Sequence, residues 1–439
     1  MSAAGTRATG ALVRNTTWLA GGRVASQLMS VALTVVVARG LGTAGFGQFA
    51  FVGAVVVIGS VVTSFGTDAL LVREIAGGRG DPARLLAAAL GLQLLLSAGF
   101  VLLVLAGAGW LPHGTGGMVS ALRIYALSLF PLAFTSVFSA ALRGWERMDL
   151  AAVLGVVTAA LPAVAALAAV RAGAPLPTLM LCLLATQAVS AALGWRLCRV
   201  ARPGFTLAAP TARAALVTML KRAWPFALLA GLPLVSQRIG VLLLTLLAGD
   251  APAGWFAAAA RVVEGLKLTH YAFLGALFPL ASRLGAQGTP GGSEVGHPAN
   301  EWLARLVQKS RLVLLGLGVG AAIAASTLAA PLVRLLYGVE YHPAVTALRI
   351  LAWALLPYAA AAPTALALVS TGHERVVLHA GTVALIVTAG LGAWLIPRVG
   401  VNGACVAVLA GEGMRGALLV LAAGRIATPR FAPDAAVYQ

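Results

Sequence analysis

The chain has few charged residues, and this scarcity indicates its class. Charged side chains make up 10% of the 439 residues and hydrophobic ones 60%, with a mean hydropathy of +0.93. A soluble domain usually has about 25% charged residues. Apolar stretches recur along the whole chain, and they are too long for the alternating strands of an outer-membrane barrel. The composition therefore predicts a polytopic helical membrane protein and excludes a soluble protein with a single anchor.

Cysteine and catalytic motifs are also lacking. Cys182, Cys198 and Cys405 lie in or beside apolar stretches, and they suggest neither a disulfide framework nor a metal cluster. The sequence has no His-Glu-x-x-His, Cys-x-x-Cys, Walker glycine loop or Gly-x-Ser-x-Gly motif. On the expected outer side, Asp250 and Glu340 each stand alone. We therefore expect a protein that is not an enzyme, with no metal, no nucleotide site and no cofactor.

Acidic residues are strongly outnumbered. The 31 Lys and Arg residues exceed the 13 Asp and Glu residues, which gives a net charge of +18. Twenty of the basic residues fall on one side of the expected spans, six on the other and five within spans. Because Lys and Arg collect in cytoplasmic loops, both termini are expected in the cytoplasm. The charge excess is explained by topology, so no nucleic-acid partner is expected.

Twelve apolar stretches have roughly the 20 residues that a membrane-spanning helix needs. They are 16–38, 46–66, 85–108, 119–140, 149–170, 177–198, 223–248, 254–279, 306–329, 344–369, 376–396 and 401–422. We therefore expect an all-α fold with twelve transmembrane helices. Proline predicts bends in three of them, at Pro131, at Pro162, and at Pro225 with Pro233.

The two halves of the chain repeat one another. Matching segments include Ser26-Gln27 with Ser236-Gln237, Ala44-Gly45-Phe46 with Ala253-Gly254-Trp255, Ala121-Leu122-Arg123-Ile124 with Ala347-Leu348-Arg349-Ile350, Pro131 with Pro357, and Gly144-Trp145-Glu146-Arg147 with Gly372-His373-Glu374-Arg375. We expect a six-helix lobe in 1–200, a basic cytoplasmic linker in 201–222 and a second six-helix lobe in 223–439. Parallel repeats of this kind are typical of transporters that bind their substrate between the repeats.

The stretch 254–279 breaks the apolar pattern of the spans. Arg261, Glu264 and Lys267 recur every three residues, which places them on one face of a helix. A charge at membrane depth costs roughly 2.5–3.5 kcal/mol on insertion scales, so it normally faces protein or water. The row therefore indicates a polar, largely cationic cavity with most of its charge on the second lobe. The alternative is an internal ladder in which the three groups neutralise one another.

A polar stripe also runs along the first span. Thr16, Arg23, Gln27, Ser30 and Thr34 share one helical face. Ser and Thr often bond to their own backbone, but this does not explain the arginine. Arg23 is interpreted as a cavity-lining residue, with snorkelling to the cytoplasmic surface as the alternative.

Two further acidic positions lie at or within spans. Asp68 follows the second span and is a candidate cation or proton site, with pairing to Arg73 as the alternative. Glu412 and Arg415, three residues apart in the last span, are interpreted as a structural pair.

The chain resembles a known family at short motifs. The start Asn15-Thr16-Thr17-Trp18 with Arg23, the turn Ala38-Arg39-Gly40-Leu41-Gly42-Thr43-Ala44-Gly45-Phe46-Gly47 and the Gly-x-Glu-Arg turns carry the resemblance. They are similar to bacterial polysaccharide-biosynthesis export proteins, the O-antigen-type oligosaccharide flippases of the MOP superfamily, which are related to MATE antiporters and to the lipid II flippase.

The resemblance implies transport across the bacterial cytoplasmic membrane. Proteins of this family flip a polyprenyl-pyrophosphate-linked oligosaccharide by alternating access of two lobes around a cationic cavity. It implies membrane lipids as surroundings, and a glycan polymerase and glycosyltransferases as partners. Arg23, Arg238, Arg261 and Lys267 are the expected pyrophosphate contacts, because Arg and Lys form charge-assisted bonds with phosphate. Gln27, Gln237 and Glu264 are expected to contact sugar hydroxyls or hold the arginines.

Other functions stay open. A MATE-type antiporter of cationic drugs is one alternative, although cations outnumber acids within the spans. A membrane enzyme or a scaffold for envelope assembly is another. A proton or sodium gradient is the expected energy source, with Asp68 and Glu264 as candidate coupling residues.

Overall fold

A computed structural model describes residues 3–78, 80–111, 114–207, 213–287 and 298–427, and the regular structure within these ranges is entirely helical. The first part contains α1 (Ala3–Ser64), α2 (Thr67–Ala76), α3 (Pro82–Gly107), η1 (Ala108–Trp110), α4 (Gly116–Ala126), α5 (Leu129–Gly144), α6 (Met148–Arg171) and α7 (Leu176–Ala201). The second contains α8 (Arg213–Ala248), α9 (Asp250–Gln287), α10 (Pro298–Thr327), α11 (Ala329–Tyr337), η2 (Val339–Tyr341), α12 (Pro343–Ala352), α13 (Leu355–Ser370), α14 (Glu374–Val399) and α15 (Val401–Ala427). The expected all-α membrane fold is confirmed.

The expected number of twelve spans is not reproduced. Within the described ranges, ten helical stretches are long and apolar enough to cross a membrane. The first two expected spans, 16–38 and 46–66, both overlap the single stretch Val24–Ser64. The expected span 254–279 lies in α9. Because α9 carries several charged residues, it is not one of the ten apolar stretches.

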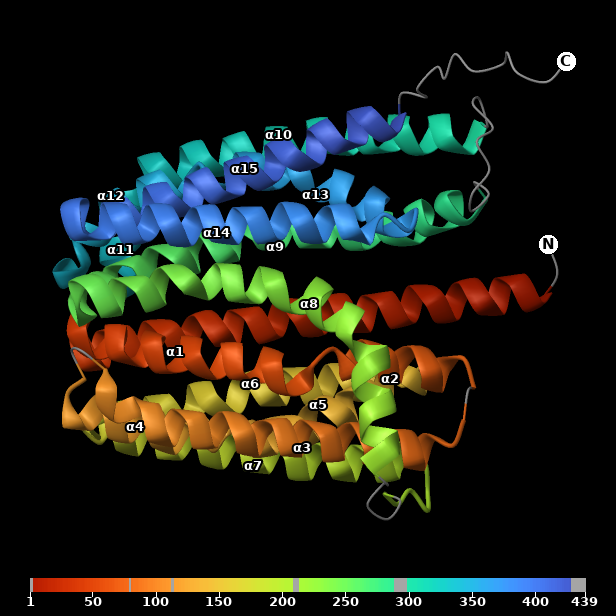
Figure 1. The fold of residues 1–439 in the computed structure, drawn as a ribbon, viewed down its shortest axis with the longest axis horizontal. Coiled ribbons are helices and arrows are strands. Elements are labelled where there is room, and N and C mark those ends of the chain that lie inside the picture. The colour runs from red at the N-terminus through yellow and green to blue at the C-terminus, as the bar shows by residue number, and fades with distance from the viewer. Residues whose placement is uncertain (1–2, 79, 112–113, 208–212, 288–297, 428–439) are drawn as a thin grey trace, which may run out of the picture.

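The helix α1 contains a sharp turn that brings its two segments side by side. Gly42 has φ 68° and ψ −175°, which is not helical and which only glycine adopts easily. Figure 1 shows the red ribbon running from the beginning of α1 to one end of the molecule and then returning. The segments on either side of Gly42 thus correspond to the first two expected spans.

Proline sets matching breaks in the two halves. The helix before Pro131 ends at Ala126 and restarts at Leu129, and the helix before Pro357 ends at Ala352 and restarts at Leu355. A proline ring clashes with the carbonyl four residues before it, which places each break where it is observed. The bend expected at Pro131 is confirmed, and the offset of 226 residues between the breaks matches the sequence repeat.

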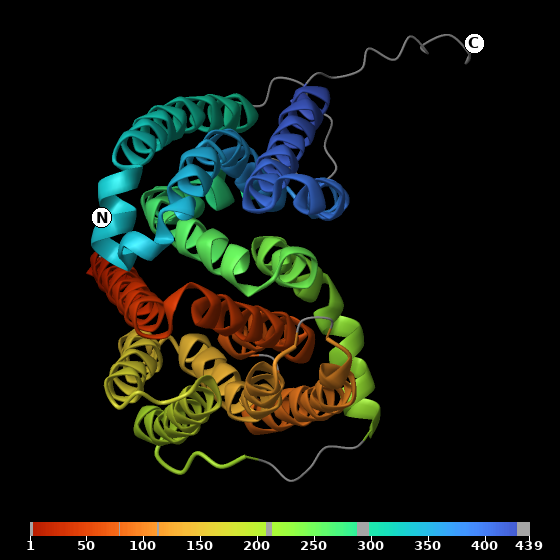
Figure 2. The same cartoon turned by 90° about the vertical axis from the view of Figure 1, so that its left-hand side faces the viewer.

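The molecule consists of two lobes, with α8 passing between them. Figures 1 and 2 show α2 to α7 on one side and α9 to α15 on the other. Near the beginning of α8, Met219 and Ala223 pack in the hydrophobic cluster of the first lobe, while Val241 and Leu244 further along pack against α9. The helix bends between these parts (Figure 1) and contains Pro225 and Pro233. The expected linker, 201–222, ends within this helix.

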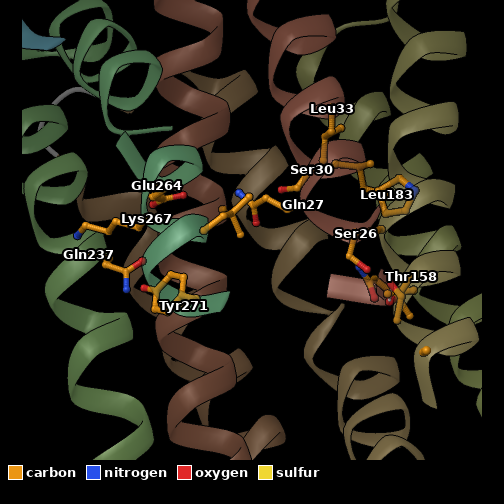
Figure 3. A pocket seen from close by; sticks show the side chains of 18 of the residues that line it. Ser26, Gln27, Ser30, Leu33, Thr158, Leu183, Gln237, Glu264, Lys267 and Tyr271 are labelled. Atoms are coloured by element: carbon orange, nitrogen blue, oxygen red, sulfur yellow. Dashed lines mark hydrogen bonds between the residues drawn. The ribbon is translucent and has the colours of Figure 1, made fainter. Parts of the chain in front are cut away.

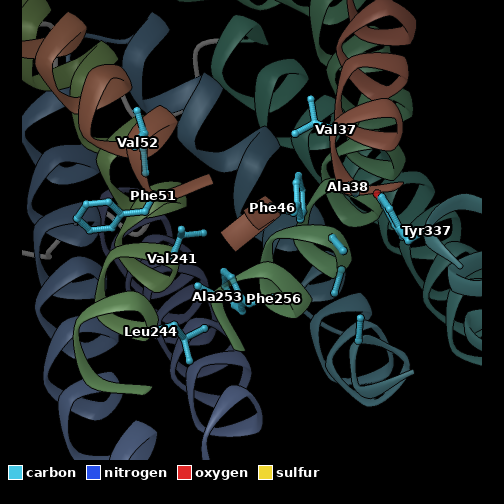
Figure 4. Packing of buried hydrophobic residues seen from close by; sticks show 14 of the residues in the cluster. Val37, Ala38, Phe46, Phe51, Val52, Val241, Leu244, Ala253, Phe256 and Tyr337 are labelled. Atoms are coloured by element: carbon cyan, nitrogen blue, oxygen red, sulfur yellow. The ribbon is translucent and has the colours of Figure 1, made fainter. Parts of the chain in front are cut away.

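The lobes pack tightly at the end where α8 meets α9. Phe46 and Phe51 of α1, Phe256 of α9 and Tyr337 of α11 share one buried cluster (Figure 4). Backbones also approach closely, since a Cβ added at Gly47 would lie 1.8 Å from the Asp250 carbonyl oxygen. Glycine is therefore needed where α1 and α9 meet.

Polar contacts join the lobes at this same end. The Tyr341 hydroxyl lies 3.0 Å from the Ala38 carbonyl oxygen and 3.1 Å from that of Gly42. The Arg39 guanidinium donates from Nε to the Leu336 carbonyl oxygen at 2.9 Å. Gln48 donates to the Asp250 carboxylate at 2.7 Å. At the opposite end, where α1 begins and α15 ends, the helices of the two lobes spread apart (Figure 1).

Candidate functional site

A cavity of about 790 Å³ lies between the two lobes. Its lining includes Gly22, Ser26, Gln27, Ser30, Leu33, Phe49, Gly53, Tyr125, Ala151, Ala152, Gly155, Thr158, Ala159, Pro162, Met180, Leu183, Gln187, Gln237, Glu264, Lys267, Leu268 and Tyr271. Figure 3 shows Ser26, Ser30 and Thr158 on one side, with Gln237, Glu264, Lys267 and Tyr271 on the other. We call this space the central cavity.

The first lobe contributes uncharged polar groups to the central cavity. Ser26, Gln27 and Ser30 come from consecutive turns of α1, and Thr158 and Gln187 come from α6 and α7. Hydroxyl and amide groups both donate and accept hydrogen bonds. This wall is therefore suited to a neutral ligand rich in hydroxyl groups.

The second lobe contributes the charge. Among the described lining residues, the charged ones are Glu264 and Lys267, both on α9. Gln237 of α8 lies beside them (Figure 3) and matches Gln27 in the sequence repeat. The repeat comparison predicts an uneven distribution of charge with Arg23 as the contribution of the first lobe, and this stays a prediction because the Arg23 side chain lies outside the part that the structure describes.

Two of the expected substrate-binding arginines, Arg238 and Arg261, contact Glu264. Its carboxylate accepts a hydrogen bond of 2.8 Å from Arg261 and lies 3.7 Å from the guanidinium of Arg238. Arg261 also donates from Nε to the Thr34 hydroxyl at 3.1 Å, which links α9 to α1 across the lobes. Neither Arg238 nor Arg261 is among the residues that line the central cavity. Direct contact of these arginines with a substrate therefore remains a prediction.

Lys267 leaves the charge row and turns to another helix. Its Nζ lies 3.9 Å from the Glu412 carboxylate and 4.7 Å from the centre of the Tyr358 ring. The same carboxylate pairs with Arg415 at 3.5 Å, as the three-residue spacing predicts. The internal ladder thus forms between Arg261 and Glu264 but does not extend to Lys267.

The ionised groups form a network with excess positive charge. Four cations, Arg238, Arg261, Lys267 and Arg415, surround the carboxylates of Glu264 and Glu412. Two carboxylates neutralise two of the four cations, so the network favours an anionic ligand. Sequence reasoning missed the link from Lys267 to Glu412 and Tyr358. The charges within the last span were the available signal, since a charge inside a membrane usually finds a partner there.

The remaining predicted residues lie away from the lining of the central cavity or outside the part of the chain that the structure describes. Arg23 lies in α1, and its side chain is outside the part that the structure describes, so its role stays a prediction. Asp68 accepts hydrogen bonds from Ser136 and, at 3.3 Å, from Gln93 in the first lobe. The alternative pairing of Asp68 with Arg73 does not form between these two described residues. Asp68 is not among the described lining of the central cavity.

Glu264 is expected to stabilise the fold as well as to line the cavity. Replacing Glu264 with alanine leaves two partly buried guanidiniums without their carboxylate, so we expect the free energy of unfolding to fall by about 1–3 kcal/mol. Denaturant unfolding of the purified protein in detergent, followed by tryptophan fluorescence, measures this change. The exposed carboxylate of Glu340 provides a control, Glu340→Ala. Equal stability of the two variants would contradict the bridging role of Glu264.

The two-lobed fold is similar to that of solved transporters of the MOP superfamily. A multidrug resistance MATE family transporter in an inward-facing conformation matches with a TM-score of 0.74 and 16% identity, over 92% of this chain and 94% of that one. The lipid II flippase MurJ in an inward closed conformation matches with a TM-score of 0.75 and 10% identity, over 92% and 87%. An outward-facing MATE family transporter matches with a TM-score of 0.62 and 16% identity, over 95% and 95%.

The sequence shows the family to which the chain belongs. Residues 12–285 match the sequence model described as "Polysaccharide biosynthesis protein", so the chain belongs to that family. This confirms the resemblance found in the short motifs. No curated protein sequence matches the chain.

Proposed function

We propose that the protein moves a polyprenyl-pyrophosphate-linked oligosaccharide across the cytoplasmic membrane. The single observation that carries this proposal is the division of the central cavity into an uncharged polar wall and a charged wall. Membership of the polysaccharide biosynthesis family supports a sugar as the cargo. The excess of cations around Glu264 and Glu412 supports an anionic link between the sugar and its lipid.

Each wall has a separate task in this proposal. Lys267 contacts the pyrophosphate, because an ammonium replaces part of the hydration that the phosphate loses on leaving water. Gln27 and Gln237 hydrogen-bond to sugar hydroxyls from opposite lobes. Arg261 and Arg238 act through Glu264, which they hold in place. Arg23 is a further candidate for the phosphate.

Alternating access is proposed as the mechanism. With both termini in the cytoplasm, the packed end of the molecule faces outward and the spread end faces the cytoplasm. The higher TM-score against an inward-facing than an outward-facing MATE transporter is consistent with this state. Substrate enters from the cytoplasm, and separation at the Gly47 contact releases it outside. A proton or sodium gradient drives the cycle, with Asp68 as the candidate coupling residue and Glu264 as a second.

Export of cationic drugs is the competing function. A drug exporter needs carboxylates that are free to bind a cation. Here Glu264 contacts two arginines, and Glu412 contacts a lysine and an arginine. At this network both carboxylates are already compensated by cations, which favours an anionic ligand there over a cationic drug.

Transport into vesicles tests the proposed function directly. The purified protein is reconstituted, and uptake of a polyprenyl-pyrophosphate-linked sugar is measured beside uptake of a cationic dye, with and without an ion gradient. We expect uptake of the glycolipid and none of the dye. Uptake of the dye alone would establish the alternative.

Arg261 offers a variant for the same assay. Because Arg261→Ala leaves Glu264 with Arg238 alone and removes the link to Thr34, we expect glycolipid transport to fall about tenfold, the effect of one lost charged hydrogen bond. Surface glycan in cells should fall as well, with drug resistance unchanged. Arg349→Ala, on an exposed arginine outside the cavity, provides the control. Full glycolipid transport by Arg261→Ala would exclude its role.

A further inference from the structure

A second cavity, of about 360 Å³, lies inside the second lobe between α8, α9, α13, α14 and α15. Apolar side chains make up most of its wall, among them Leu228, Leu232, Leu274, Leu366, Val377 and Leu378. We call this space the apolar cavity. It differs from the central cavity, where polar side chains of both lobes alternate with apolar ones.

The two cavities meet at the charged network. Gln237, Lys267 and Tyr271 line both of them. Glu412 and Arg415 line the apolar cavity alone. A ligand that contacts Lys267 therefore has polar surroundings on one side and apolar surroundings on the other.

The charged groups lie at the inner end of the apolar cavity. Along α8, Leu228 precedes Gln237 and is closer to the end of the molecule where α15 ends. Val369 lies near the end of α13, which is on the same side. Leu228 is 48% exposed and Val369 38% exposed, so the apolar end of the cavity reaches the protein surface.

We propose that the apolar cavity holds the isoprenoid segment next to the pyrophosphate of the lipid-linked sugar. This inference rests on the proposed function. It assigns a binding place to the lipid part of the substrate, which the proposed function does not place. The pyrophosphate lies at Lys267, the sugar occupies the central cavity, and the first prenyl units extend past Leu232 and Leu378 toward the surface. The rest of the lipid chain lies in the bilayer.

Charge and polarity both select this occupant. A neutral apolar molecule would leave the excess cations at the inner end uncompensated, whereas a prenyl pyrophosphate supplies an anion there and hydrocarbon beyond it. Burial of apolar surface is favourable in proportion to the area removed from water, so each prenyl unit adds affinity until the cavity is full.

Binding of short prenyl pyrophosphates tests the assignment. The full chain in lipid nanodiscs is titrated with inorganic pyrophosphate and with geranyl and farnesyl pyrophosphates, and Tyr and Trp fluorescence is followed. Two variants fill the apolar cavity from different helices, Ala365→Phe on α13 and Val377→Phe on α14. Val383→Phe, on an exposed position of α14 outside the cavity lining, is the matched control. Thermal unfolding verifies that each variant is folded.

We expect farnesyl pyrophosphate to bind wild-type protein at least about tenfold more tightly than inorganic pyrophosphate. This gain should disappear in both cavity-filling variants and persist in the control, with affinity for inorganic pyrophosphate unchanged in all three. Partition into the bilayer affects all variants alike and does not reproduce this pattern.

The outcomes separate this inference from the function on which it rests. If the gain persists in folded Ala365→Phe and Val377→Phe, the apolar cavity does not hold the prenyl segment, while pyrophosphate binding still supports the proposed function. If wild-type protein binds neither pyrophosphate nor its prenyl esters, the proposed function fails and the inference fails with it.

Discussion

Replacing Lys267 with alanine is expected to lower glycolipid transport by about 10- to 100-fold, the effect of losing a charged hydrogen bond to phosphate. Lys267 is the lysine that lines both cavities, so no other described cation occupies the same junction. Its removal leaves Glu412 paired with Arg415, so the fold keeps a partner for that carboxylate. We therefore expect the loss to appear in transport rather than in stability. Uptake of radiolabelled glycolipid into vesicles measures it.

Two further variants make the result specific to Lys267. Lys267→Arg keeps the charge and should retain most of the activity. Lys309→Ala removes an exposed lysine of α10 and should behave as wild type. If Lys267→Ala transports at the wild-type rate, the pyrophosphate does not bind at this junction. If its stability falls as far as its transport, Lys267 is a structural residue.

Adding one methyl group at Gly47 is expected to disrupt the packed end of the molecule. In Gly47→Ala the new Cβ would lie 1.8 Å from the Asp250 carbonyl oxygen, and neither backbone can yield without moving its helix. Overpacking of this kind costs about 1–3 kcal/mol, which shifts a two-state equilibrium by about 5- to 150-fold. We expect the outward-open state to accumulate and glycolipid transport to fall by a similar factor.

Spin labels provide the measurement for this second prediction. Labels at Trp110 and Val339, which are 89% and 67% exposed, report the distance between the lobes at their packed end. The distance should lengthen in Gly47→Ala. Gly99→Ala is the control, because a Cβ at Gly99 meets nothing within 4 Å. An unchanged distance in Gly47→Ala would show that the contact does not hold the lobes together.

Much of the fold was predictable because membrane helices follow from hydropathy and proline position. The break before Pro131 and its repeat before Pro357 follow from a steric rule that acts over four residues. The path of α8 was less predictable. Its sequence predicted a bend, but the packing of Met219 and Ala223 in the first lobe depends on contacts distant in sequence.

The candidate site was predictable in its residue types and less so in its connections. The spacing of Arg261 and Glu264 predicted their pairing, since residues three apart are neighbours on a helix. The spacing also placed Lys267 on this face, yet its long side chain reaches Glu412 on α15. The assembled fold decides which helices face one another. A single sequence therefore does not predict which residues of two spans contact each other.

The contacts of Tyr341 and Arg39 have a consequence for the energy of opening. A helix leaves its last carbonyl groups without partners inside the helix. Tyr341 of the second lobe covers such carbonyls where α1 turns at Gly42, and Arg39 of the first lobe covers that of Leu336 at the end of α11. Each lobe thus caps a helix end of the other. The Tyr341 bond to Ala38 is buried, so it is shielded from water until the lobes separate, whereas the exposed Arg39 bond already competes with water. Once the lobes separate, water can hydrogen-bond to the freed carbonyls, which lowers the cost of opening.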